Sequence, residues 1–205
     1  MAATKNLIFD LGNVLYDIDF SKMYAAFNAL GIPNFENHFT LNKSDPLFFD
    51  LELGLINEQE FCIRFNTLYH LQLSSAQIIE AWNSLLVGYR AQSIDWIKEH
   101  NTRFPTFLYS NTNQIHYDHF IPEFAKQRGW DFESLFKTPY YSHQMGMRKP
   151  DPSSFQHILE KEGLLAAETL FIDDNEPNIL AAASVGMQVL WLQPGMSIEN
   201  DLLMS

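Results

Sequence analysis

Short apolar runs that alternate with helical patterns limit the possible folds of this chain more than any other feature. Such an alternation is typical of βα units, in which helices cover a mostly parallel sheet. The apolar runs predict strands over residues 6–10, 105–110, 168–173 and 187–192, with a weaker candidate at 139–142. We therefore expect an α/β fold built on a parallel sheet.

Helix signals follow two of these strand candidates. Pro152 opens a helix that runs to Gly163, and Pro177 opens another that ends at Gly186. Proline is favoured in the first turn of a helix and glycine just after its last residue. Both segments are therefore expected to be the helices of βα units.

A long segment of different character separates the first two strand candidates. Over residues 20–89 the apolar residues recur at helical spacing, and hardly any stretch looks like a strand. Asn57-Glu-Gln-Glu60 has the pattern of a capping box, and Ser74 or Ser75 caps the helix that follows. The pattern predicts a helical insertion directly after the first strand.

The insertion divides the chain into two predicted parts. Residues 16–92 are expected to form a helical cap module, and residues 1–15 and 93–205 one discontinuous core domain. The 205 residues are 46% apolar and 14% aromatic, which is enough for a buried core and a sizeable insertion.

Polar side chains stand where strands are expected to end. Asp10 ends the first apolar run, Ser110 closes the second, and the pair Asp173 and Asp174 closes the third. Lys149 stands in a Gly-Met-Arg-Lys-Pro string just before a predicted helix. Ligands of doubly wound sheets bind outside the carboxyl ends of the strands. A carboxylate, a hydroxyl, an ammonium group and a carboxylate pair are what metal-assisted phosphoryl transfer needs.

Each of these residues also has a plain structural interpretation. Asp10 precedes a Gly-Asn turn and fits ordinary turn chemistry. Ser110 can cap a helix, although a hydroxyl and free amide groups at a helix start also bind phosphate. The pair Asp173 and Asp174 can be an acidic helix cap, yet two adjacent carboxylates are electrostatically costly without a cation. Such an oxygen-rich site suits Mg²⁺.

The remaining candidates carry weaker signals. Asn175 and Asn178 are either donors to the carboxylates or capping residues, and Arg148 is expected to face solvent. His116 and His119 are interpreted as a solvated helix face, because no third ligand is in register for zinc. The large aromatic residues of the insertion are expected in the core rather than in a pocket; they are Phe48, Trp82 and Tyr89.

The charge balance excludes some partners. The chain has 25 acidic and 13 basic residues, a net charge of −12, and no Lys/Arg cluster. Nucleic acid and anionic membrane surfaces are therefore unlikely to be bound. No apolar stretch has the length of a membrane span, and the N-terminus does not look like a signal peptide. Cys62 is the one cysteine and is expected in the core, so we predict a soluble, cytoplasmic protein.

The strand-end pieces, in this order, resemble the haloacid dehalogenase superfamily of phosphatases. The matching strings are Phe9-Asp-Leu-Gly-Asn-Val14, Ser110-Asn111, Lys149-Pro150 and Asp173-Asp174-Asn175. With the helical insertion, the resemblance spans nearly the whole chain. Longer strings, such as Asp17-Ile-Asp-Phe20 and Gly146-Met-Arg-Lys-Pro150, look similar to the bacterial α-D-glucose-1-phosphate phosphatase subgroup. That subgroup is near the phosphatase domain of soluble epoxide hydrolases.

The resemblance implies a fold, a reaction and roles for named residues. The fold would be a Rossmann-like, doubly wound parallel sheet with a four-helix cap. The protein would be a Mg²⁺-dependent phosphatase of a small phosphorylated metabolite, such as α-D-glucose 1-phosphate, with Asp10 as the nucleophile that becomes an aspartyl-phosphate. Mg²⁺ would be held by Asp10, the Gly12 carbonyl, Asp174 and Asp173. The phosphoryl oxygens would be held by Ser110, Asn111 and Lys149.

The sequence departs from the family pattern at Gly12. Most family phosphatases carry a second aspartate there, two positions after the nucleophile, as general acid and base. General acid–base catalysis by such a residue typically raises the rate by a factor of about 10²–10⁴. Three explanations for the missing aspartate are open. Asp17 or Asp19 folds over the site and takes its role, water acts as the acid and base, or the leaving group needs little protonation. A sugar 1-phosphate fits the last, because it releases an acidic anomeric hydroxyl.

Three alternative functions use the same residue types. A response-regulator receiver has its acidic pair first and no helical insertion, so the chain order argues against it. A metal-independent haloacid dehalogenase would use Asp10 on carbon and leave the carboxylate pair without a purpose. A phosphosugar-binding protein that has lost turnover, together with its acid–base residue, is the non-catalytic alternative.

Overall fold

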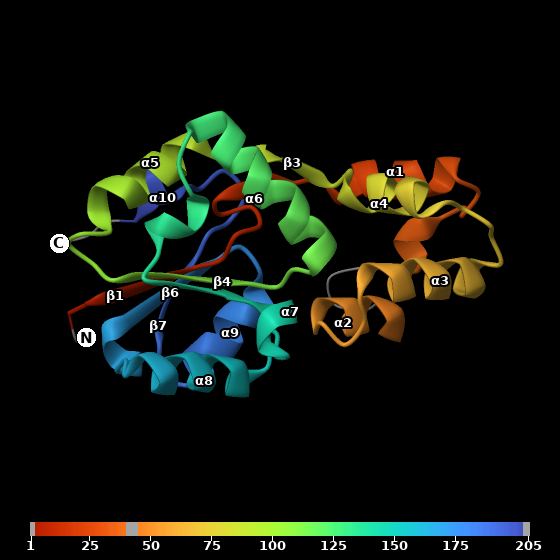
Figure 1. Cartoon of the computed structure of the whole chain (residues 1–205). Helices are drawn as coiled ribbons and strands as arrows, with labels where there is room; N and C mark the ends of the chain where they lie inside the picture. Colours follow the sequence, from red (N-terminus) through yellow and green to blue (C-terminus); the bar gives the residue numbers. More distant parts are fainter. Residues whose placement is uncertain (1–2, 40–44, 203–205) are drawn as a thin grey trace.

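A parallel five-stranded sheet forms the centre of the larger part of this computed structural model, which describes residues 3–39 and 45–202 (Figure 1). The strand order is β5-β4-β1-β6-β7. The strands are β1 (Asn6–Phe9), β4 (Thr106–Ser110), β5 (Thr138–Tyr141), β6 (Thr169–Asp173) and β7 (Gln188–Trp191). They confirm the five predicted strands to within a residue or two at each end.

Helices cover both faces of this sheet (Figure 1). One face carries α5 (Ala91–His100), α6 (Gln114–Arg128) and α10 (Ile198–Asp201), with the 3₁₀ helix η2 (Phe132–Leu135). The other face carries α7 (Ser142–Met145), α8 (Pro152–Glu162) and α9 (Glu176–Ser184), and the 3₁₀ helix η3 (Ala166–Glu168) leads into β6. Helix α8 has the predicted bounds, whereas α9 begins one residue before Pro177 and ends two residues before Gly186.

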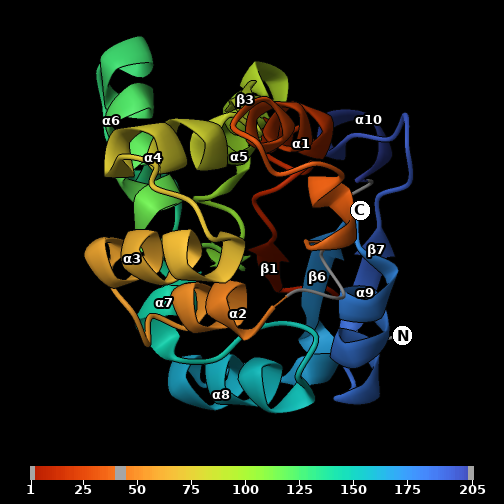
Figure 2. The same ribbon diagram turned by 90° about the vertical axis from the view of Figure 1, so that its right-hand side faces the viewer.

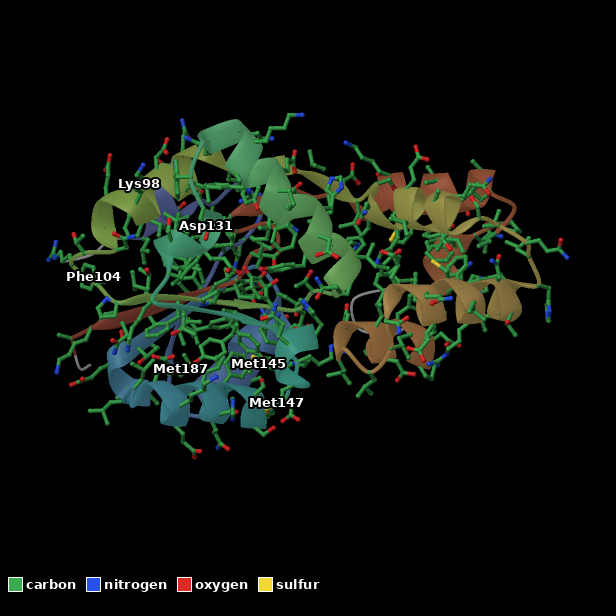
Figure 3. All side chains as sticks on the ribbon, in the orientation of Figure 1. Lys98, Phe104, Asp131, Met145, Met147 and Met187 are labelled. Carbon is green, nitrogen blue, oxygen red and sulfur yellow. The ribbon has the colours of Figure 1, made fainter. Side chains whose placement is uncertain are left out.

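The side chains of β1 alternate between the two helical layers. Leu7 and Phe9 pack in the cluster that contains the buried residues of α5 and α6, whereas Ile8 packs with those of α8 and α9. Figure 3 shows the same division: Lys98 and Asp131 lie in one layer, and Met145, Met147 and Met187 lie in the other. A strand buried on both faces reads as a continuous apolar run, which is why β1 was predictable.

The segment after β1 forms a helical cap at one end of the sheet (Figures 1 and 2). Its helices are α1 (Phe20–Ala29), the 3₁₀ helix η1 (Phe35–Asn37), α2 (Pro46–Glu52), α3 (Glu58–Tyr69) and α4 (Ser75–Asn83). Asn57 and Glu60 form the predicted capping box, and Ser74 rather than Ser75 caps α4. The predicted helical insertion is confirmed, while the boundaries at 15/16 and 92/93 stay a prediction.

A short antiparallel ribbon connects the cap to the sheet domain. It pairs β2 (Tyr16–Ile18) with β3 (Leu86–Tyr89), and its register shifts between Asp17 and Ile18. The expectation of a purely helical stretch over residues 20–89 is wrong at β3. The strand has four residues, includes Gly88 and continues the apolar spacing of α4, so no period of two was visible.

Aromatic side chains make up most of the cap core. The fully buried Trp82 ring lies 5.2 Å from Phe39, 5.3 Å from Phe48 and 5.5 Å from Phe61, measured between centroids. Cys62 is buried in the same cluster, as expected. The cap therefore has a core of its own, separate from the two clusters that flank the sheet.

Within the described residues, none of the helices has both the length and the apolar character needed to cross a membrane.

Candidate active site

The strand ends bring the predicted polar residues to one edge of the sheet. Parallel strands β4, β1 and β6 are neighbours, so Ser110, Asp10 and Asp173 meet at their carboxyl ends. Phe9 lies opposite Leu108 on one side and Ile172 on the other. The Asp10 amide donates to the carbonyl oxygen of Ile172 at 2.9 Å, which extends the sheet ladder by one residue.

Lys149 lies between two of the carboxylates. Its Nζ is 2.6 Å from Asp10 Oδ1 and 2.7 Å from Asp173 Oδ2, and the residue is 1% exposed. The Asn111 side chain holds the backbone here, since its Nδ2 donates to the Lys149 carbonyl and its Oδ1 accepts from the Lys149 amide, both at 2.9 Å. Lys149, which had the weakest signal in the sequence, is the cation at the centre of the cluster.

Asparagine side chains and amides hold the carboxylate pair. Asp173 Oδ1 accepts from the amide of Asn175 at 2.7 Å, and Asp173 Oδ2 accepts from Asn178 Nδ2 at 3.0 Å as well as from Lys149. Asp174 Oδ2 accepts from Asn13 Nδ2 at 2.9 Å. Both oxygens of Asp173 therefore already have partners, and Asn178 is a donor to a carboxylate rather than a cap.

Burial and mutual repulsion shift the protonation of this cluster. Burial raises the pKa of Asp10 to about 7; Lys149 opposes the rise, and Asp173 and Asp174 add to it. Burial also raises the pKa of Asp174, with Asn13 opposing and Asp173 adding. For Lys149, burial alone would lower the pKa, but Asp10 and Asp173 together raise it above its ordinary value. One cation thus faces three carboxylates, which leaves the cluster short of positive charge.

The donor set of this cluster fits a hard divalent cation. Asp10, Asp173 and Asp174 each offer a carboxylate oxygen, and these atoms all lie within 4.8 Å of one another. Oxygen ligands of this kind suit Mg²⁺. A divalent ion would supply the positive charge that Lys149 alone does not.

Gly12 lies directly under the side chain of Ile18. A Cβ atom built at Gly12 would be 3.1 Å from Ile18 Cδ1 and 3.8 Å from Asp10 Oδ2. Ile18 packs against both the sheet-domain cluster and the cap cluster. The space beside Asp10 where a side chain of residue 12 would stand is therefore partly filled by the cap connection.

Neither Asp17 nor Asp19 folds over the site, so that proposed substitute for the missing aspartate is wrong. Asp17 Oδ1 pairs with Arg90 Nε at 2.6 Å. Asp19 caps helix α1, where its Oδ1 accepts from the Ser21 amide at 2.9 Å. Consecutive side chains of an extended segment alternate in direction, and the one between them, Ile18, is the side chain that lines the site.

Two adjoining pockets meet at this edge of the sheet. The carboxylate pocket contains Asp10, Asn13, Lys149 and Asp174. The aromatic pocket extends toward the cap and the ribbon; it contains Ser110, Tyr16, Phe20, Phe39, Trp82 and His116. Both pockets are lined by Gly12, Ile18, Glu52 and Asn111. Trp82, which we expected in the core only, is buried in the cap and also forms a pocket wall.

Glu52 and Arg148 join the cap to the sheet domain at the site. Glu52 Oε2 is 3.0 Å from Arg148 Nε, and the Arg148 guanidinium lies 4.6 Å from the centroid of the Phe49 ring. The expectation that Arg148 faces solvent is wrong, because the end of α2 covers it. Sequence reasoning missed Glu52, since a glutamate at a helix end shows no pattern that distinguishes it from a surface residue.

His116 is buried between the cap and α6, contrary to the expected solvated face, whereas His119 is exposed. Its ring lies 5.2 Å from the Trp82 ring, and its Nε2 donates to the Trp82 carbonyl at 3.2 Å. Nδ1 accepts from Asn113 at 3.1 Å. Burial lowers the pKa of His116 to about 4, so the ring is neutral at pH 7. Phe120, one helical turn later, was the signal that this face is buried.

The fold and the site together define a Rossmann-like α/β protein with a helical cap inserted after its first strand. Residues 4–186 match the model of the haloacid dehalogenase-like hydrolase family. The chain belongs to this family of hydrolases, which confirms the resemblance at the level of the superfamily. The finer likeness to the glucose-1-phosphate phosphatase subgroup stays a prediction.

Relatives of known structure or activity are similar over nearly the full chain. The D-ribitol-5-phosphate phosphatase of Bacteroides thetaiotaomicron is 27% identical over 199 residues, which cover 97% of this chain and 96% of that protein. A crystal structure of a haloacid dehalogenase family enzyme from the same organism, in complex with magnesium and inorganic phosphate, is 32% identical with a TM-score of 0.82; the coverage is 95% and 96%. A haloacid dehalogenase-like hydrolase from Porphyromonas gingivalis is 30% identical with a TM-score of 0.89, covering 98% and 97%.

Proposed function

We propose that this protein is a Mg²⁺-dependent phosphatase that hydrolyses a small phosphomonoester through an aspartyl-phosphate on Asp10. The observation that carries the proposal is the buried cluster in which Lys149 bridges Asp10 and Asp173 beside Asp174. The phosphatase activity of the ribitol-5-phosphate relative, and the magnesium and phosphate bound by the related enzyme, support it.

We assign the roles of the side chains from their places in the two adjoining pockets. Asp10 is the nucleophile, and its attack forms a bond from a carboxylate oxygen to phosphorus while the ester P–O bond breaks. Lys149 and Ser110 bind the phosphoryl oxygens and stabilise their charge as the bonds change, and Asn111, whose side chain holds the Lys149 backbone, positions that lysine. Lys149 also fixes the rotamer of Asp10 through the 2.6 Å contact.

The residues fit Mg²⁺ bound by Asp10, the Gly12 carbonyl and Asp174. When bound, the ion supplies positive charge to the phosphoryl oxygens. Asp173 was predicted as a further metal ligand, but its two oxygens already accept from Asn175, Asn178 and Lys149. We propose instead that Asp173 mainly holds Lys149 in place.

The decisive assay uses p-nitrophenyl phosphate, whose leaving group needs little protonation. We expect turnover that EDTA removes and added Mg²⁺ restores. Halide release from a 2-haloacid without Mg²⁺ would select the dehalogenase alternative. Binding of a phosphosugar with Mg²⁺ but without release of phosphate would select the non-catalytic alternative.

Magnesium affinity is expected to rise with pH. The Asp10 carboxyl has a pKa of about 7 without the metal, and it must lose its proton before it binds the ion. Below pH 7 the proton competes, so the Mg²⁺ dissociation constant should fall about tenfold between pH 6 and pH 8 and then level off. Isothermal titration in buffers of different ionisation enthalpy should show a released proton near pH 6. Equal affinities at pH 6 and pH 8 would contradict the assignment of Asp10 as a ligand.

For the substrate, we propose a small phosphorylated sugar or polyol. The carboxylate pocket takes the phosphoryl group, and the adjoining aromatic pocket takes the remainder of the molecule. Glucose 1-phosphate should be hydrolysed with a higher kcat/KM than glucose 6-phosphate, because its anomeric oxygen is the better leaving group. Ribitol 5-phosphate, the substrate named for the relative, belongs in the same panel. A glucose 1-phosphate value no higher than that for glucose 6-phosphate would exclude the sugar 1-phosphate as the preferred substrate.

A further inference from the structure

The site described above has a nucleophile but no side chain at position 12 to protonate the leaving group. Asp17 and Asp19 are the next acidic residues after position 12. Asp17 is paired with Arg90, and Asp19 caps the start of α1. Asp10, Asp173 and Asp174 surround Lys149 and belong to the metal cluster. An acid for the leaving group would therefore have to come from another part of the fold.

The bridging oxygen of a bound phosphomonoester must lie where the two pockets meet, because it joins the phosphoryl group to the rest of the substrate. Only four of the described residues line both pockets: Gly12, Ile18, Glu52 and Asn111. Gly12 and Ile18 have no proton to give, and the Asn111 amide is bound to the Lys149 backbone. Glu52 is thus the single titratable side chain in the described part of the chain that stands at this junction.

We propose that Glu52, supplied by the cap, is the general acid and base that replaces the missing aspartate of the family. This inference rests on the proposed phosphatase function and deepens it, because it assigns the proton transfers of the same site.

The cap fixes the place of this carboxyl group. Glu52 is the last residue of α2, and Gly54 follows it with a φ of 68°. A Cβ at Gly54 would overlap the carbonyl oxygen of His143, so the end of α2 packs directly on α7 of the sheet domain. Arg148 holds Glu52 from the other side at 3.0 Å. The carboxyl is therefore placed by contacts with the sheet domain, not by the cap alone.

Two features of its surroundings act on the Glu52 carboxyl in opposite directions. Burial raises the pKa of Glu52, although Arg148 opposes the rise. After the proton has left, the carboxylate remains beside the Arg148 guanidinium, which stabilises its charge.

The two half-reactions then balance. Asp10 attacks phosphorus, the ester P–O bond breaks, and the leaving oxygen takes the proton of Glu52 and departs as an alcohol. Water then attacks the phosphorus of the aspartyl-phosphate, the Glu52 carboxylate takes a proton from that water, and the bond between phosphorus and Asp10 breaks. Phosphate is released, and Glu52 is protonated again.

The test compares Glu52→Gln with the wild type on two esters that differ in leaving group. The first is p-nitrophenyl phosphate, and the second is glucose 6-phosphate or ribitol 5-phosphate, whichever the wild type hydrolyses faster. The value of kcat/KM reports the step that breaks the ester bond. We expect a loss of about 10²–10⁴ on the alkyl ester and a value close to the wild type on p-nitrophenyl phosphate. If Glu52 served only in packing, the substitution would lower kcat/KM by the same factor on both substrates.

Asp50→Asn is the matched control. Asp50 stands on the same helix and pairs with Arg64 at 2.8 Å, but it lines neither pocket. It should leave kcat/KM unchanged on both esters. If Glu52→Gln fails to fold, Glu52→Asp replaces it, because this substitution withdraws the carboxyl by one methylene. The kcat/KM of Glu52→Asp should still fall further on the alkyl ester than on the aryl ester.

The outcomes separate this inference from the proposed function. If the wild type shows no turnover of p-nitrophenyl phosphate that requires Mg²⁺ and Asp10, the phosphatase proposal fails. If the wild type turns over and Glu52→Gln lowers kcat/KM equally on both esters, or on neither, the role of Glu52 is overturned and the phosphatase proposal stands.

Discussion

Asp10→Asn is expected to lower kcat for p-nitrophenyl phosphate by about 10⁴–10⁶-fold, the range seen when a member of a catalytic unit is removed from an enzyme. The amide has nearly the shape of the carboxylate but does not attack phosphorus, so the aspartyl-phosphate does not form. Rapid quenching of the wild type should trap phosphate on the protein, and the variant should trap none. Both measurements are made at saturating Mg²⁺, so that a weaker metal site does not imitate a lost nucleophile.

The control for Asp10→Asn is a measurement showing that the variant still folds. Lys149 keeps its 2.7 Å contact with Asp173 in Asp10→Asn, and the Asp10 amide bond to Ile172 involves only the backbone. The circular dichroism spectrum should therefore match that of the wild type. Turnover of the variant at the wild-type rate would remove Asp10 from the reaction and with it the proposed mechanism.

Lys149→Met is expected to lower the free energy of unfolding by about 3–5 kcal/mol, because it removes the cation that contacts two carboxylates of a buried charge cluster. Asp10 and Asp173 would then be left beside Asp174 without the ammonium group that each now contacts. Urea unfolding at pH 8 without Mg²⁺ measures the effect. Added Mg²⁺ should recover part of the loss, since a ligand that binds only the folded state stabilises it.

Lys5→Met is the comparison for that measurement. Lys5 pairs with Glu168 at 2.7 Å, as short as the contacts of Lys149, but its side chain is 62% exposed. Exposed pairs contribute about 0–1 kcal/mol, so this variant should unfold nearly like the wild type. Similar losses for both variants would mean that burial of the Lys149 cluster does not matter for stability.

Sequence patterns predicted the elements whose signals are local. The apolar runs predicted β1, β4 and β6 because these three central strands are buried on both faces, and Asn57 with Glu60 predicted a helix start because the capping box lies within four residues. The strand-end residues Asp10, Ser110 and Asp173 were predictable together, since parallel topology brings carboxyl ends to one edge.

Contacts between cap and sheet domain were not predictable in the same way. His116 and Arg148 are covered by Trp82 and Glu52, which are distant in the chain, and no periodicity of a single segment reports such covering. The ribbon strand β3 is set by its pairing with β2 and not by its own four residues. The missing information was therefore tertiary placement rather than local propensity.

The packing of Ile18 over Gly12 also bears on how an acid–base residue could be restored at this site. An aspartate could take up the acid–base role at position 12 only if the isoleucine gave way, and that isoleucine holds sheet domain and cap together. The two positions are therefore coupled, because a Cβ at Gly12 would require a small shift of the Ile18 side chain. Gly12→Asp should therefore change how the cap is seated on the sheet domain as well as the proton chemistry of the site.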